Sequence, residues 1–305
     1  MSKTYSGFTE ADVSAQAGKC FVVTGANSGL GFEASRALAA RGARVILACR
    51  DENKAHDAMR RIKQTTPGAD LRFLSYDQSD LDSIRHAAEE IEREPRIDVL
   101  VNNAGVMIPP LMRTKQGFEL QFGVNHLGCF AFTSLLLPKL AATHGSRVVV
   151  TASLAHTSGR IDWDDLNAEK SYERWPRYAM SKLANLLYLF ELDRRLRIAG
   201  SSVTAAGCHP GFATTDLGRH MPGIGILWML FRPFSNTPAM GAWPTLLAAA
   251  GPAAPGEYYG PQGFREIKGS AGVARRAHQA TDPELARRLW DVSIEMTDVD
   301  PCLPP

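Results

Sequence analysis

The sequence predicts an α/β fold, in which helices cover both faces of a doubly wound parallel sheet of about seven strands. Short apolar runs alternate with helical stretches up to about residue 215, which is typical of a parallel sheet with helical crossovers. The runs are rich in valine, leucine and phenylalanine, as strands buried on both faces require. Because such crossovers are right-handed, the successive units wind the sheet outward from its first strand.

Six strands and the helices between them can be placed by residue number. The strands are expected at residues 19–26, 44–50, 71–77, 97–105, 146–153 and 200–211. The helices are expected at residues 28–43, 51–65, 81–94 and 118–140, and in a stretch that contains residues 177–187. Gly42 favours the end of the first helix, and Asp51 is a favourable N-cap for the second.

The chain is expected to form one domain preceded by an arm. Residues 1–17 are polar and form the predicted N-terminal arm, and residues 18–300 form the domain. Within the domain, residues from about 212 to 240 are apolar but interrupted by proline and glycine, which predicts a substrate loop with short helices. A helix over residues 241–250 is expected to follow.

The composition favours a globular enzyme and argues against several other classes. The 305 residues are 45% hydrophobic and 22% charged, and the net charge of +2 leaves no electrostatic footprint for nucleic acid. The five cysteines are scattered without a CxxC pair, so free thiols are expected, with no metal site. No uncharged run is long enough for an integral membrane segment and the N-terminus has no signal-peptide core, so the expected location is cytoplasmic.

A glycine-rich turn, TGANSGLG at residues 24–31, joins the first strand to the first helix. Its glycines let the backbone turn tightly and approach a pyrophosphate closely, and the N–H groups that begin the helix attract the same anion. Glycine spacing alone would also suit a plain tight turn, but the strand–turn–helix context favours a dinucleotide site. The residues expected to contact the cofactor here are Gly25, Asn27, Ser28, Gly29, Leu30 and Gly31.

The end of the second strand predicts which dinucleotide binds. A carboxylate there would hydrogen-bond the ribose hydroxyls of NAD, whereas Arg50 follows the strand in this chain. A guanidinium pairs with a 2′-phosphate in a forked geometry, so NADP(H) is the expected cofactor. Lys54 is a weaker candidate for the phosphate. The alternative is that Arg50 is a solvated loop residue beside a helix cap at Asp51.

Several motifs occur in an order that resembles the short-chain dehydrogenase/reductase family, over roughly residues 18–290. They are TGANSGLG, NNAG, Asn125 in GVNHLG, Ser153 in VTASLAH, YAMSK at residues 178–182, and HPG at residues 209–211. The stretches ACRD, SLAHTSGRIDWDDLN and YAMSKLANLL further resemble the retinol dehydrogenase branch, which is related to protochlorophyllide reductases. The resemblance implies a Rossmann-like fold, NADP(H) as cofactor and an apolar alcohol or carbonyl compound as substrate.

Tyr178 and Lys182 are the predicted acid–base pair. Residues four apart lie on one helix face, so the lysine ammonium is expected to lower the pKa of the phenol. The phenol would then exchange a proton with the alcohol or carbonyl oxygen. The resemblance implies that Ser153 hydrogen-bonds that oxygen, that Asn125 holds a water that relays protons, and that Lys182 also bonds the nicotinamide ribose.

Other cofactor contacts are expected where the third, fourth and sixth strands end. The third strand should end near the adenine, and the fourth should line the cofactor groove. The resemblance implies that the end of the sixth strand faces the nicotinamide, and that either Thr214 or Thr215 bonds the carboxamide. In chain order the expected residues are Asp77, Gln78, Asn102, Ala104, Gly105, Tyr178, Lys182, Pro210, Gly211 and Thr214.

Three further segments allow more than one interpretation. The apolar residues 221–234 suit a cover for an apolar ligand, a subunit contact, core packing or a transient membrane contact. The acidic DWDD at residues 162–165 is interpreted as a solvated loop, and His209 as a structural residue. The resemblance implies a homodimer or homotetramer that pairs through the helices holding residues 129–137 and 182–190.

The expected activity is the interconversion of an apolar alcohol and its aldehyde or ketone by hydride transfer. A reductase of an activated C=C bond is an alternative, because the same tyrosine would protonate the product. A catalytically silent NADP-binding regulator is a second alternative. The intact set of Asn125, Ser153, Tyr178 and Lys182 favours the enzyme, since a silent binder has no need of it.

Overall fold

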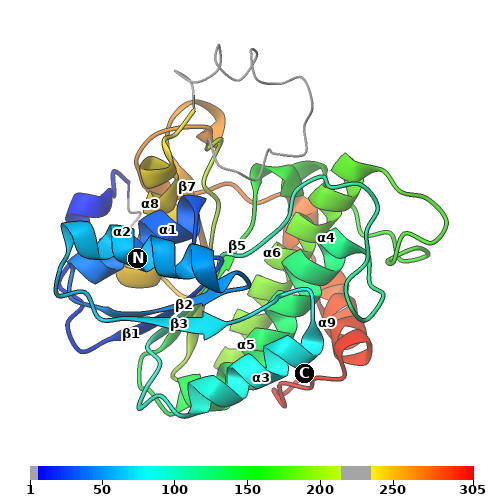
Figure 1. Ribbon diagram of the computed structural model, residues 1–305. Helices are drawn as coiled ribbons and strands as arrows, with labels where there is room; N and C mark the ends of the chain where they lie inside the picture. The colour runs from blue at the N-terminus through cyan, green and yellow to red at the C-terminus, as the bar shows by residue number, and fades with distance from the viewer. Residues whose placement is uncertain (1–5, 214–234) are drawn as a thin grey trace.

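The computed structural model describes residues 6–213 and 235–305, which are built around one sheet (Figure 1). The sheet has eight strands in the order β3-β2-β1-β4-β5-β6-β7-β8. They are β1 (Cys20–Thr24), β2 (Arg44–Cys49), β3 (Leu71–Ser75), β4 (Val99–Asn102), β5 (Arg147–Thr151), β6 (Thr204–Cys208), β7 (Glu257–Pro261) and β8 (Ala271–Val273). Only β7 and β8 pair in antiparallel orientation within the described part. The predicted doubly wound α/β fold is confirmed.

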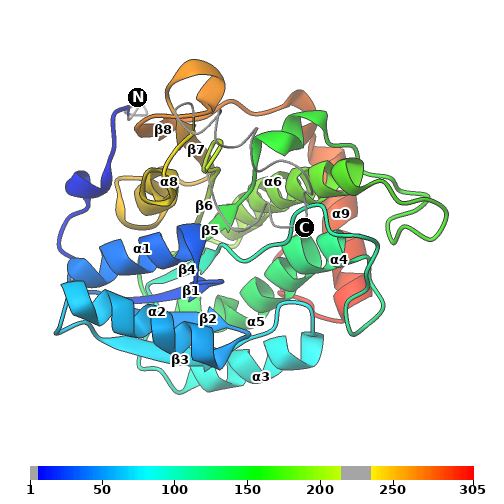
Figure 2. The same cartoon turned by 45° about the horizontal axis from the view of Figure 1, so that its top comes forward.

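A layer of helices covers each face of the sheet (Figure 2). One layer holds α1 (Gly29–Ala40), α2 (Glu52–Thr65) and α8 (Pro238–Ala250). The other holds α3 (Leu81–Glu92), α5 (Cys129–Ala141), α6 (Arg174–Ile198) and α9 (Pro283–Thr297). Successive strand side chains point to opposite faces, so Val23 packs with the first layer and Val22 with the second.

The six predicted strands and the helices between them are confirmed, with two differences in the helices. The helix expected over residues 118–140 is broken into α4 (Leu120–Phe122), a π-helical turn (Gly123–Gly128) and α5. The helix expected from residue 241 begins earlier, at Pro238. Thr237 caps that helix by accepting a 3.2 Å hydrogen bond from the Met240 N–H, and proline is favourable in the first turn.

One helical stretch of the described chain, Leu120–Ala141, has the length and composition of a membrane-crossing helix. In the fold, 89% of it is buried against other parts of the protein. Core helices of large domains pass the same test of length and apolarity. The stretch packs between the sheet and α3 and α6, as expected of a core helix.

Phe8 pairs with β8, the strand at one edge of the sheet. Phe8 and Ala271 exchange two backbone hydrogen bonds, of 3.0 Å and 2.8 Å. Glu10 then forms a 2.6 Å ion pair with Arg36 on α1. The described part of the predicted arm therefore packs along the domain.

The acidic segment at residues 162–165 is not simply a solvated loop. The Asp165 carboxylate is buried, lies 2.9 Å from Arg177 Nη2, and accepts backbone hydrogen bonds from residues 169–171. The Arg177 guanidinium also donates to the carbonyls of Asp165 and Ser171. The interpretation as a solvated loop is wrong for Asp165, because this pair folds the segment against the start of α6.

This buried pair predicts a matched set of stability effects. Asp165→Leu leaves the buried guanidinium with only the half-exposed Asp162 carboxylate, 3.5 Å away, so we expect the melting temperature to fall by about 5 °C or more. The double variant Asp165→Leu/Arg177→Met removes both charges and should be more stable than the single variant. Thermal unfolding followed by circular dichroism measures both. A single variant that melts with the wild type, or a double variant that melts below it, would contradict the assignment.

Candidate active site

The turn between β1 and α1 has the geometry of an anion cradle. Gly25 and Gly29 have φ of +66° and +55°, where side-chain-bearing residues are strained. A Cβ at Gly31 would overlap the Gly25 carbonyl, so the turn closes tightly on the helix. Ser28 is the N-cap but makes no side-chain capping bond, which leaves the first N–H groups of α1 available to a ligand. This arrangement fits the pyrophosphate of a dinucleotide.

Asn103 fixes this turn, and the sequence analysis missed it. Its side-chain amide donates to the carbonyls of Thr24 at 2.9 Å and Gly25 at 3.4 Å. The Thr24 hydroxyl in return accepts from the backbone N–H groups of Asn103 at 3.0 Å and Ala104 at 2.9 Å. The turns after β1 and β4 are therefore held together, and the second asparagine of NNAG was the signal that could have identified this lock.

Two residues predicted to contact the cofactor, Asn102 in the groove and Gln78 near the adenine, use their side chains inside the protein. Asn102, the last residue of β4, donates a 2.8 Å hydrogen bond to Thr133 on α5, so its side chain points into the core. The buried Gln78 amide donates to the carbonyls of Val124 at 2.5 Å and Ala104 at 3.2 Å. Gln78 thus supports the wall of the groove, and its amide group is not free to contact a ligand.

The end of β2 presents one guanidinium to solvent. The Arg50 side chain is 76% exposed, and its Nη1 lies 3.9 Å from the Asp77 carboxylate. Asp51 is the N-cap of α2 as predicted, and it accepts a 3.0 Å hydrogen bond from the Lys54 N–H. The Lys54 ammonium folds back to 3.3 Å from the Asp51 carboxylate. Of the two candidate cations, Arg50 is therefore more available to a bound phosphate than Lys54.

Tyr178, Lys182 and Ser153 are brought together by α6 and the end of β5. The Lys182 ammonium lies 5.9 Å from the centroid of the Tyr178 ring, one helical turn away. The Ser153 side chain lies close enough to the Tyr178 phenol to act on its pKa, in the lowering direction. Ser153 follows β5, where its Oγ also accepts a 3.2 Å hydrogen bond from the Ala155 N–H. The three side chains meet at the carboxyl edge of the sheet, where ligands of parallel α/β folds bind.

The electrostatics of Tyr178 differ from the prediction. Burial raises the pKa of the phenol above its usual value, and the Ser153 side chain only partly opposes that rise. The predicted lowering by Lys182 is therefore wrong for the protein alone. The desolvation of the phenolate outweighs the attraction of an ammonium that stands beside the ring.

Lys182 is buried without a carboxylate. Its Nζ donates to the Thr151 carbonyl at 3.1 Å, and no ion pair to it occurs among residues 6–213 and 235–305. Burial lowers the pKa of the ammonium to about 8. An ammonium has three donors, so N–H groups remain for hydroxyl groups of a ligand.

Asn125 positions the turn that follows β4. Its Oδ1 accepts from the Val106 N–H at 2.7 Å, and its Nδ2 donates to the Val106 carbonyl and to Ser181 Oγ, both at 2.9 Å. A Cβ at Gly105 would lie 2.9 Å from Asn125 Oδ1 and 3.6 Å from Lys182 Nζ. Asn125 stands in the π-helical turn, a deviation often found at functional sites. The side chain thus ties this turn to α6 beside Lys182.

The HPG turn after β6 lies against the same site. A Cβ at Gly241 would touch Leu30 of the glycine turn and Ala213, which places the two turns next to one another. Gly211 has φ of +68°, and the Pro210 carbonyl accepts a 3.0 Å hydrogen bond from the Asn236 amide. Thr214, Thr215 and the apolar residues 221–234 lie outside the described residues.

Metal chemistry finds no support in the described chain. No group of three or more histidine, cysteine, aspartate or glutamate side chains suited to a metal ion occurs there. All five cysteines are free, as predicted, and four of them are buried. His209 is fully buried and bonded within the protein, which agrees with its interpretation as a structural residue.

Comparison with known proteins gives one consistent result. The family model described as short chain dehydrogenase matches residues 19–222. Human retinol dehydrogenase 11 is 43% identical over 284 residues, covering 92% of this chain and 86% of that protein. Human retinol dehydrogenase 13 is 43% identical over 298 residues, covering 93% and 86%. The crystal structure of an uncharacterized protein from Mycobacterium paratuberculosis is 39% identical, with a TM-score of 0.82 over 97% of this chain and 99% of that one.

The depressed pKa of Lys182 predicts that stability rises with pH. Folding lowers that pKa from 10.5 to about 8, so the unfolded chain binds more protons between these values. The free-energy cost of burying the charged ammonium is fully present below about pH 8 and disappears as the pH rises toward 10.5. Lys182→Met removes this cost, so its advantage in melting temperature over the wild type should be larger at pH 7 than at pH 10.

Thermal unfolding at several pH values tests this expectation. Lys63→Met, at an exposed position of α2, is the control and should follow the wild-type pH dependence. A constant difference between Lys182→Met and wild type across the range would contradict the buried ammonium.

Proposed function

The chain belongs to the short-chain dehydrogenase family of oxidoreductases, and from this premise we propose that it uses NADP(H) to interconvert an apolar alcohol and its aldehyde or ketone. The observation that carries the proposal is the meeting of the Tyr178 phenol, the Ser153 hydroxyl and the buried Lys182 ammonium beside a glycine cradle. A buried phenol and a buried ammonium form no ion pair that would stabilise the fold. The proposed proton transfer uses both, the phenol as the proton donor and the ammonium as the charge that stabilises the phenolate.

The cofactor would be held by groups that the fold leaves available. The first N–H groups of α1 suit the pyrophosphate, and the Arg50 guanidinium suits a 2′-phosphate. The remaining N–H groups of Lys182 suit the ribose hydroxyls next to the nicotinamide. When bound, the reduced nicotinamide supplies a hydride to the carbonyl carbon of the substrate.

Tyr178 then acts as the proton donor. Because burial raises its pKa, the phenol carries its proton at neutral pH and is ready to protonate the carbonyl oxygen. Ser153 donates a hydrogen bond to that oxygen as negative charge develops. The Lys182 ammonium stabilises the phenolate that remains, so this charge arrangement favours carbonyl reduction.

The apolar substrate class is supported by the surface around Tyr178. Trp175, one turn earlier on α6, is 52% exposed and lies 6.0 Å from the Tyr178 ring between centroids. Met107 and Ile108, which follow β4, pack in one apolar cluster with Tyr178. The curated relatives named above are retinol dehydrogenases, whose name denotes an apolar polyene alcohol. Apolar side chains beside the proton donor suit a substrate of that kind.

Tyr178→Phe tests the proton donor. We expect NADPH-dependent reduction of retinal and of aliphatic aldehydes to fall about 10³-fold, because general acid catalysis is lost. The dissociation constant for NADPH, measured by fluorescence titration, should change less than about threefold, since the cofactor contacts remain. Tyr188→Phe, on the same helix but packed against Trp290, is the matched control. Full turnover by Tyr178→Phe would remove Tyr178 from the mechanism.

Arg50→Ala tests the cofactor preference. Loss of a charge-assisted contact to the 2′-phosphate should raise the KM for NADPH about tenfold and leave the KM for NADH nearly unchanged. Steady-state kinetics with both cofactors measures the ratio. Arg60→Ala, at an exposed position of the same region, is the control. Equal effects on the two cofactors would exclude Arg50 from the phosphate site.

A further inference from the structure

We propose that Glu266, acting through His209, is a positioning residue that fixes the HPG turn beside the cofactor site. Glu266 lies in the segment between β7 and β8, 57 residues after His209 in the chain. It touches neither Tyr178 nor Lys182 in the described contacts, so its effect has to pass through the histidine. The inference rests on the proposed NADP(H) site, because the turn it fixes is the one expected to face the nicotinamide.

His209 has its tautomer set by the turn itself. The ring is fully buried, and its Nδ1 accepts a 3.1 Å hydrogen bond from the Gly211 N–H. An imidazole nitrogen that accepts carries no proton, so in the neutral ring the proton is on Nε2. The ring therefore holds the Gly211 N–H with one nitrogen and presents a donor on the other.

The donor faces the Glu266 carboxylate. His209 Nε2 lies 3.3 Å from Glu266 Oε2, although without the alignment of a full hydrogen bond. The other carboxylate oxygen accepts a 2.9 Å hydrogen bond from the Arg275 N–H, which braces the group. Burial alone would raise the pKa of Glu266, but His209 and the Arg275 N–H outweigh it and lower that pKa. The carboxylate is therefore anionic where it meets the histidine.

Residues of β7 confine the His209 imidazole to one position. A Cβ at Gly260 on β7 would overlap His209 Nε2, so glycine is required there. The Tyr258 ring, also on β7, lies 5.3 Å from the imidazole between centroids. Gly260 and Tyr258 of β7 thus confine the imidazole, and the Glu266 carboxylate lies 3.3 Å from its Nε2.

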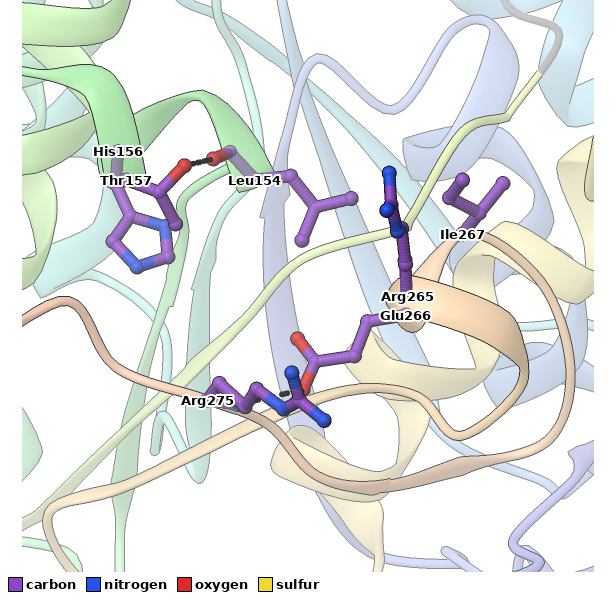
Figure 3. A pocket seen from close by; sticks show the side chains of 7 residues that line it. All are labelled: Leu154, His156, Thr157, Arg265, Glu266, Ile267 and Arg275. Carbon is purple, nitrogen blue, oxygen red and sulfur yellow. Dashed lines mark hydrogen bonds and ion pairs between the residues drawn. The ribbon is translucent and has the colours of Figure 1, made fainter.

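The backbone at Glu266 is strained in a way that supports a specific role. Arg265 and Glu266 have φ of 49° and 59°, in the left-handed region where residues with side chains are strained. Figure 3 shows the Glu266 side chain directed toward Arg275 at the wall of a cavity of about 350 Å³, across from Leu154 and His156. Strain of this kind persists where surrounding contacts hold the residue in place.

The stretch that follows β8 supports the turn that carries Ser153. His156 Nδ1 donates to the Ser153 carbonyl at 2.6 Å, and its Nε2 accepts from the Ala277 N–H at 3.3 Å. The HPG turn is joined directly to the segment between β7 and β8 as well, because the Phe212 N–H donates to the Ile267 carbonyl at 2.9 Å. In this set of contacts, Glu266 acts on the turn through the His209 side chain, by a carboxylate oxygen 3.3 Å from Nε2.

Removal of the Glu266 carboxylate should therefore weaken cofactor binding and leave the rate of the chemical step nearly unchanged. Without the carboxylate, the imidazole loses its hold on Nε2 and the Gly211 N–H loses a fixed acceptor. The HPG turn then loosens, while Tyr178, Ser153 and Lys182 keep their own contacts. We expect Glu266→Ala to raise the dissociation constant and the KM for NADPH about tenfold, with kcat within about twofold of wild type.

The matched variants separate positioning from general stability. Glu266→Gln keeps an oxygen that accepts from Nε2–H, so it should bind NADPH within about threefold of wild type. Gly260→Ala places a methyl group against His209 Nε2, which should displace the ring and reproduce the weakened binding of Glu266→Ala. Glu295→Ala, exposed on α9, should behave as wild type.

Two results would overturn the inference. One is wild-type NADPH binding by Glu266→Ala, and the other is equal weakening by Glu266→Ala and Glu266→Gln. The ¹⁵N chemical shifts of His209 give a readout that needs no cofactor: the Nε2–H tautomer should dominate in wild type and become mixed in Glu266→Ala. A protein that neither binds NADPH nor turns over any aldehyde defeats the proposed function, and unchanged His209 shifts in Glu266→Ala then defeat the positioning role independently.

Discussion

The buried ammonium of Lys182 is the group around which three parts of the fold converge. Its charge has no carboxylate among the described residues, so the cost of desolvation is met only by the Thr151 carbonyl at the end of β5. Gly105 is small enough to let the turn after β4 lie against it, and Asn125 holds that turn in place. A strand end, a turn and a helix are thus arranged around one charge, which has donors left for a ligand.

The fold was largely predictable because its central strands are buried on both faces. The uninterrupted apolar runs at residues 45–49 and 148–150 have few other interpretations in a chain where such runs alternate with helices. β8 has only three residues, too few for a pattern, and its place depends on pairing with β7 and Phe8. The π-helical turn escaped detection because the sequence around it stays apolar, with no proline to mark the break.

The candidate site was predictable in its residues but less so in its contacts. The NNAG motif contains both asparagines, but only Asn102 was predicted to contact the cofactor. Three-dimensional placement shows that Asn102 points into the core and that Asn103 holds the glycine turn. Helix spacing placed Tyr178 beside Lys182, but the pKa of the phenol depends on burial, which spacing does not measure. Glu266 belongs to no motif, and its relation to His209 arises from the pairing of β6 with β7.

The backbone pairing of Phe8 with Ala271 has a consequence for the solubility of the protein. β8 is the last strand of the sheet, and its outer edge would otherwise offer unpaired N–H and C=O groups to any extended chain. Phe8 pairs with Ala271 on that edge, so it hinders the addition of a strand from another molecule. Removal of residues 1–8 would therefore promote self-association of the protein before it changed the chemistry of the site.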